Sequence, residues 1–131
     1  MKRLIHNPDL GLLILRAFAG LSMAFAHGLN KLPPADGFVN AVGQMGFPLP
    51  IVFAWSAGLS EFLGGLLIAV GLFTRHASLF LGFTMVVAAF GAHAADPFGK
   101  KELSLIYLAI CALMIFQGAG RFSLDRMLRK V

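Results

Sequence analysis

Charged residues are scarce in this chain. Asp, Glu, Lys and Arg make up only 13% of its 131 residues, about half of the roughly 25% that is typical of soluble domains. Hydrophobic residues reach 58%, and the mean hydropathy is +0.80. This composition excludes a water-soluble globular domain. It predicts an all-α integral membrane protein that forms a single domain over residues 1–131.

Cysteine and acidic residues are also rare. The only cysteine, Cys111, lies inside an apolar run, which excludes a disulfide framework and a paired-thiol redox motif. Eleven basic residues against six acidic ones leave a net charge of +5. No basic patch alternates with aromatic residues, so nucleic acid is not predicted as a partner. The chain shows no internal repeat, low-complexity segment or linker.

Four long apolar runs dominate the chain. A helix rises ~1.5 Å per residue, so about 20 apolar residues cross the ~30 Å hydrocarbon core of a bilayer. The first run also has the outline of a signal peptide, but Arg16 interrupts it and favours a retained span. The sequence therefore predicts a four-transmembrane-helix bundle, with spans at about residues 10–28, 51–72, 77–95 and 103–119.

The connection between the first two spans, residues 29–50, carries a pattern of its own. Prolines stand near both of its ends, and between them Phe38, Val42 and Met45 recur at i, i+4 and i+7. This spacing predicts a short interfacial amphipathic helix.

Basic residues are distributed unevenly between the two ends of the predicted bundle. An even number of spans puts both termini on one side. That side holds seven basic residues and the opposite side three, namely Lys31, Lys100 and Lys101. The seven are Lys2, Arg3, Arg75, Arg121, Arg126, Arg129 and Lys130. This bias predicts that both termini are cytoplasmic, and it explains the net charge without a polyanionic partner.

Glu61 lies near the midplane of the second predicted span, among small residues such as Gly58 and Gly65. A carboxylate there is unfavourable by at least ~2.5–3.5 kcal/mol and needs a partner inside the bundle. Counted from the cytoplasmic ends of their helices, Arg16 and Glu61 lie at depths that differ by ~6 Å. We therefore expect direct contact or a single bridging water between these two side chains. Two interpretations remain open: a structural ion pair, or a protonatable group that serves a proton, quinone or cation site.

Several polar residues gather near the non-cytoplasmic ends of the spans: His27, Lys31, His93, Asp96 and Glu102. Two histidines and a carboxylate can ligate a metal ion, which makes His27, His93 and Glu102 candidate ligands. Two alternatives are histidines bonded to loop carbonyls and water, and a haem held between the two histidines. Any ligand or redox site is thus predicted in the outer half of the bundle, with the helix at 38–45 as a lid.

Several short motifs in this order resemble the DoxX family, from about residue 10 to residue 126. They are His27-Gly28-Leu29-Asn30-Lys31-Leu32, Gly46-Phe47-Pro48 with Pro50, Glu61-x-x-Gly64-Gly65, Gly71-Leu72-x-Thr74-Arg75, Glu102, and Gly118-x-Gly120-x-x-Ser123-x-Asp125. The resemblance implies a four-helix protein of the bacterial inner membrane. The family takes its name from a subunit of a thiosulfate:quinone oxidoreductase, and its members are often linked to redox systems.

The resemblance and the residues together leave three functions open. The first is a membrane subunit or accessory of a redox system, with a quinone or a metal ion bound near Glu61, Arg16, His27, His93, Glu102 and Lys31. Its partners are then the lipid bilayer, other membrane or periplasmic redox proteins, and a second copy of the chain. The second is a non-catalytic scaffold that recruits partners. The third, a small four-helix exporter, ranks last because such exporters carry their glutamate in the first helix. Whether the protein is an enzyme stays open.

Overall fold

The computed structural model describes residues 5–129, so Lys2, Arg3 and Lys130 of the predicted charge bias lie outside the described residues. The regular secondary structure of the described part is all helical, with no β-strand. In chain order its elements are α2 (Pro8–Ser22), η1 (Met23–Gly28), η2 (Leu29–Lys31), α3 (Asp36–Gln44), α4 (Pro50–Val70), α5 (Thr74–Val87), η3 (Ala88–Ala92), α6 (Phe98–Gln117) and α7 (Leu124–Leu128).

Three helices are long and apolar enough to cross a membrane. They are Pro8–Lys31, which joins α2, η1 and η2, then Pro50–Val70, and Thr74–Ala92, which joins α5 and η3. Lys100, Lys101 and Glu102 lie within the first five residues of α6, which leaves a shorter apolar stretch after them. The prediction of an all-helical membrane protein is confirmed, and three of the described helices, rather than the predicted four, have the length and composition of a membrane span.

Glycines set the register between the first helix and α4. A Cβ added at Gly28 would lie 2.3 Å from the backbone nitrogen of Phe62, and one at Gly20 would lie 2.4 Å from the carbonyl oxygen of Gly65. Only glycine permits backbones to approach this closely. Gly28 is therefore held beside Glu61 and Phe62, and Gly20, about two turns away on the first helix, is held beside Gly65 and Ala69.

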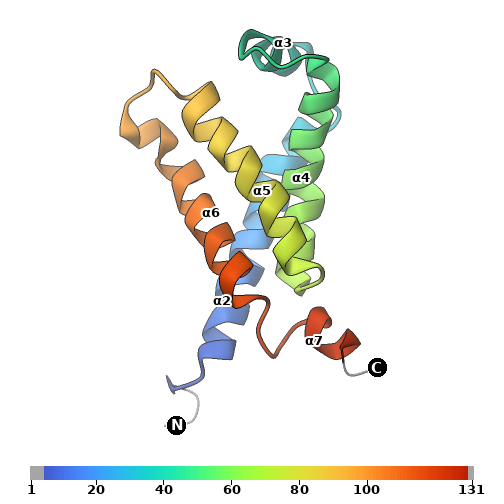
Figure 1. Ribbon diagram of the computed structural model, residues 1–131, viewed down its shortest axis with the longest axis vertical. Coiled ribbons are helices and arrows are strands. Elements are labelled where there is room, and N and C mark those ends of the chain that lie inside the picture. The colour runs from blue at the N-terminus through green and yellow to red at the C-terminus, as the bar shows by residue number, and fades with distance from the viewer. Residues whose placement is uncertain (1–4, 130–131) are drawn as a thin grey trace.

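A helix forms where the amphipathic pattern predicts one. Helix α3 packs against α4, and its Val42 is buried. Figure 1 shows α3 at one end of the bundle, whereas α2 begins and α7 ends at the other. The bundle therefore has two distinct polar ends.

The core lies where the first helix, α4, α5 and α6 meet. It contains apolar residues from all four: Ala19, Met23, Ile68, Ala77, Leu81, Met85, Tyr107 and Cys111. The outer surface is equally apolar, with Phe18, Phe80 and Phe116 between 70% and 83% exposed. Such a surface is expected where lipid replaces water as the solvent.

Candidate functional site

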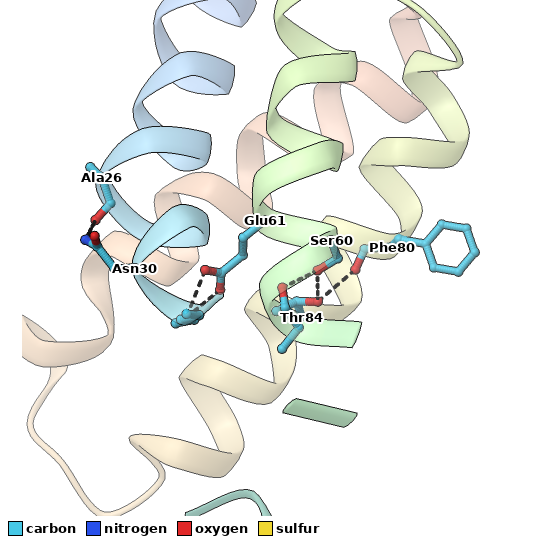
Figure 2. Close-up of polar contacts among 8 residues, drawn as sticks. Ala26, Asn30, Ser60, Glu61, Phe80 and Thr84 are labelled. Carbon is cyan, nitrogen blue, oxygen red and sulfur yellow. Dashed lines mark hydrogen bonds and ion pairs between the residues drawn. The ribbon is translucent and has the colours of Figure 1, made fainter. Parts of the chain in front are cut away.

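Lys31 and Glu61 form a buried ion pair. The Lys31 ammonium donates hydrogen bonds to both oxygens of the Glu61 carboxylate, at 2.7 Å to Oε1 and 2.9 Å to Oε2. The Glu61 side chain is only 1% exposed, whereas that of Lys31 is 34% exposed. Figure 2 shows the Glu61 carboxylate leaving α4 towards the end of the first helix, where Asn30 lies. The Glu61 carboxylate thus has its cationic partner, supplied by the last turn of the first helix.

The predicted contact between Arg16 and Glu61 is wrong. Arg16 instead donates hydrogen bonds to the carbonyl oxygens of Ile68 (3.3 Å) and Ala119 (3.1 Å), and to those of Ala69 and Phe122. The glycine contacts place Gly28 beside Glu61, and Arg16 is about 12 residues, or ~18 Å, further down its helix. The Arg16 guanidinium therefore satisfies two backbone carbonyls at the C-terminal end of α4, where helices carry partial negative charge, and two in the segment between α6 and α7.

A cavity of about 470 Å³ lies between α3, α4 and α5 and reaches the Lys31–Glu61 pair. Its walls are mostly aromatic and aliphatic, and they include all three residues of the amphipathic pattern. The apolar lining residues are Phe38, Val42, Met45, Phe47, Phe53, Ala57, Phe80, Phe83, Val87, Ala88 and Ala92. The pocket is thus an apolar space with a neutralised charge pair at its wall, a common arrangement in small-molecule sites.

Hydroxyl groups and a histidine add further polar atoms to this pocket. The Ser60 and Thr84 hydroxyls lie 2.7 Å apart and link α4 to α5 (Figure 2). His93 Nδ1 lies 2.7 Å from Asp96 Oδ2, and this hydrogen bond lowers the pKa of the Asp96 carboxyl below its usual value of 3.8. The polar groups are therefore spread around the pocket rather than gathered at one point.

The six candidate residues divide into two sets. Lys31, Glu61 and His93 all line the pocket. The ring of His27 instead packs edge-on against Tyr107, with 6.0 Å between the ring centroids. Glu102 is exposed on α6, and Arg16 lies at the opposite end of the bundle.

The metal hypothesis finds no support in this arrangement. Within residues 5–129, no three His, Cys, Asp or Glu side chains lie close enough together to hold a metal ion. His27 and His93 have separate partners, Tyr107 and Asp96. The residues present therefore do not fit a metal centre built from His27, His93 and Glu102.

Two features of this end of the bundle were not predicted from the sequence. Ser60 and Thr84 stand 24 residues apart, and only the packing of α4 on α5 brings their hydroxyls together. The first and third spans also contain π-helical turns, one over Met23–Gly28 and one over Ala88–Ala92. Such turns often mark functional sites, and here one contains His27 and the other directly precedes His93.

The comparison with protein-family models decides the family. The model described as DoxX matches residues 11–94. The chain belongs to the DoxX family. No solved structure matches it.

Relatives of this DoxX protein cover almost its whole length. It is 35% identical to the inner membrane protein YqjF of Escherichia coli, over 99% of this chain and 98% of the relative. It is 30% identical to the inner membrane protein YphA of the same organism, over 88% of this chain and 89% of the relative. A Bacillus subtilis protein named "Putative oxidoreductase CatD" is 29% identical, over 89% of this chain and 86% of the relative. With its long apolar helices, this chain is a multi-pass inner-membrane protein like its Escherichia coli relatives.

The motifs that resembled the DoxX family have structural roles. Lys31 and Glu61, from two of these motifs, form the buried pair. At the other end of the bundle, Asp125 accepts hydrogen bonds from the backbone N–H groups of Phe73 (2.8 Å) and Thr74 (3.1 Å). Gly71, whose φ is +73°, accepts a hydrogen bond from the Asp125 backbone at 2.8 Å. The C-terminal motif is thereby fastened over the turn between α4 and α5.

Proposed function

We propose that this DoxX protein is a membrane component of a redox system and binds a quinone in the pocket beneath α3. A quinone is flat, neutral and soluble in lipid, and its carbonyl oxygens accept hydrogen bonds. The pocket offers aromatic walls for the ring, and the side chains of Phe80 and Phe83 extend from it to the lipid-exposed surface. Such an opening suits a ligand that arrives from the bilayer.

The Lys31–Glu61 pair carries the proposal. An ammonium has three N–H donors, and Glu61 accepts two of those on Lys31. The third N–H donor remains for a carbonyl oxygen of the ligand. The ammonium also lies near the pocket wall, with Lys31 Nζ 5.5 Å from the centre of the Phe38 ring. The pair is neutral as a whole, so it favours an uncharged ligand over a free cation. This also weighs against an exporter, which uses a carboxylate that is not already neutralised.

Reduction of a quinone to a quinol consumes two electrons and two protons. In this proposal a partner redox protein of the membrane or the periplasm supplies the two electrons and solvent water supplies the two protons, while the DoxX protein holds and orients the ring. The name of the Bacillus subtilis relative supports a redox role.

We propose further that the chain forms a single domain of four spans, with α6 as the fourth and both termini cytoplasmic. Leu103–Gln117 provides a run of 15 residues without a charge, or ~22 Å. The long side chains of Lys100 and Lys101 extend to the interface and complete this span. Among the described residues, the end with α7 carries Arg75, Arg121, Arg126 and Arg129, in keeping with a cytoplasmic location. Reporter fusions to the C-terminus that are active only in the periplasm would contradict this orientation.

A binding experiment tests the quinone site. Quenching of the single tryptophan, Trp55 of α4, is measured as decylubiquinone is titrated into protein in detergent micelles. We expect saturable quenching in the native protein and in Ala109→Phe, which adds the same bulk on the exposed side of α6. We expect no saturable quenching in Ala57→Phe, because the new ring fills the pocket.

Two outcomes would overturn the proposal. One is quenching by the native protein that rises without saturation, as simple partition into micelles predicts. The other is equal affinity in Ala57→Phe and Ala109→Phe. Either would favour the scaffold function, in which the Lys31–Glu61 pair only fixes the packing of the first helix on α4.

A further inference from the structure

A second cavity, of about 560 Å³, lies at the end of the bundle opposite α3. The turn between α4 and α5, the end of α6 and the C-terminal segment form it. Five basic side chains line it: Arg75, His76, Arg121, Arg126 and Arg129. We propose that this cavity binds the phosphodiester headgroup of an anionic phospholipid. The proposal is independent of the quinone pocket.

The cavity has more positive charge than its own carboxylates neutralise. Its two acidic residues, Asp9 and Asp125, face four arginines. Asp9 accepts a hydrogen bond from the backbone of Arg121 at 3.0 Å, and Asp125 accepts those of Phe73 and Thr74. Within residues 5–129 the ion pairs are Lys31–Glu61 and His93–Asp96, so none of these arginines has a carboxylate within 4 Å. Arg75 donates one hydrogen bond of 3.4 Å to the carbonyl of Phe116, and the other guanidinium donors of the four arginines are available to an external anion.

The position of the cavity selects a lipid rather than a free phosphate ion. Helix α4 ends at Val70 and α5 begins at Thr74, so the cavity lies at the level where a span meets the headgroups. Large apolar side chains next to it are exposed, with Phe73 at 61%, Phe122 at 50% and Met127 at 63%. These side chains match the acyl chains of a lipid whose phosphate lies among the arginines. A free phosphate ion has no apolar part that could contact these side chains.

Lipid binding is measured on the full chain in detergent micelles by native mass spectrometry. The probes are dioleoylphosphatidylglycerol and dioleoylphosphatidylcholine, which share the phosphodiester and the acyl chains but differ in net charge. The test variant is R121Q/R126Q, whose two arginine side chains make no hydrogen bond within the described residues. The matched control, K100Q/K101Q, removes the same charge from the other end of the bundle.

We expect phosphatidylglycerol to bind more tightly than phosphatidylcholine. R121Q/R126Q should weaken phosphatidylglycerol binding on the order of 30-fold, and K100Q/K101Q should leave it unchanged. If the double variant fails to fold, R121Q and R126Q are measured singly, with about fivefold weakening expected for each.

Three results would overturn the proposal. Equal binding of the two lipids would show that net charge is not recognised. Equal weakening in both double variants would show attraction to overall charge rather than to this cavity. Displacement of phosphatidylglycerol by millimolar inorganic phosphate would show an anion site with no preference for lipid.

Discussion

The Lys31–Glu61 pair predicts an asymmetry between two single substitutions. In Lys31→Met, Glu61 stays buried, at 1% exposure, without its cation. Removing one partner of a buried pair costs about 3–5 kcal/mol. Because the Lys31 side chain is 34% exposed, solvent screens part of the interaction. We therefore expect a loss near the lower limit, about 3 kcal/mol.

In Glu61→Met the group left behind is a lysine near the end of its helix. Its flexible chain can carry the ammonium to the membrane interface. We therefore expect a loss of only about 1 kcal/mol, as for an exposed pair. The double variant Lys31→Met/Glu61→Met leaves no charge unpaired and should lose about 2 kcal/mol. The interaction energy of the cycle is then about 2 kcal/mol.

The free energy of unfolding of all four proteins is measured by steric trapping at pH 7. Lys101→Met is the control, since this lysine lies at the same end of the bundle and makes one long hydrogen bond, 3.4 Å to the carbonyl of Ala94. Its stability should match that of the native protein within about 0.5 kcal/mol. Equal losses in the two single variants, or losses that simply add in the double variant, would refute the reasoning.

Two further predictions concern the opposite end of the bundle. Arg16→Lys should lose at least about 2 kcal/mol of unfolding free energy, because one amine cannot reach all four carbonyls. Arg75→Lys is the control and should change the unfolding free energy little, because Arg75 makes a single hydrogen bond of 3.4 Å. Similar losses in the two variants would contradict this role of Arg16. Burial opposes ionisation of Asp125, but hydrogen bonds from Thr74 and Phe73 and the charge of Arg129 outweigh it, so the pKa of Asp125 lies below 3.8. Above pH 3.8, Asp125→Asn should therefore lose about 1 kcal/mol of unfolding free energy. This difference from the native protein should vanish as the pH falls through the lowered pKa of Asp125. A difference that is constant with pH, in unfolding measured from pH 7 downwards, would exclude the carboxylate as its source.

The sequence by itself determined the class of the protein and the positions of its helices. Apolar runs near 20 residues long leave no alternative to helices in lipid, because each backbone group must be hydrogen-bonded within its own segment. The spacing of Phe38, Val42 and Met45 determined the short helix α3 for a similar reason, since one apolar face must be covered. The need of Glu61 for a cation was also visible, because an unpaired carboxylate in a bilayer is so unfavourable.

Which cation meets Glu61 was decided only by the tertiary structure. Counting residues from the predicted ends of the helices placed Arg16 and Glu61 at nearly the same height. The true register depends on which residues of two helices can touch, and here Gly28 lies against the backbone of Phe62 and Gly20 against that of Gly65. Such contacts depend on the shapes of two surfaces at once, so neither helix reveals them alone. That register places Lys31 on Glu61 and Arg16 on the carbonyls at the far end of α4.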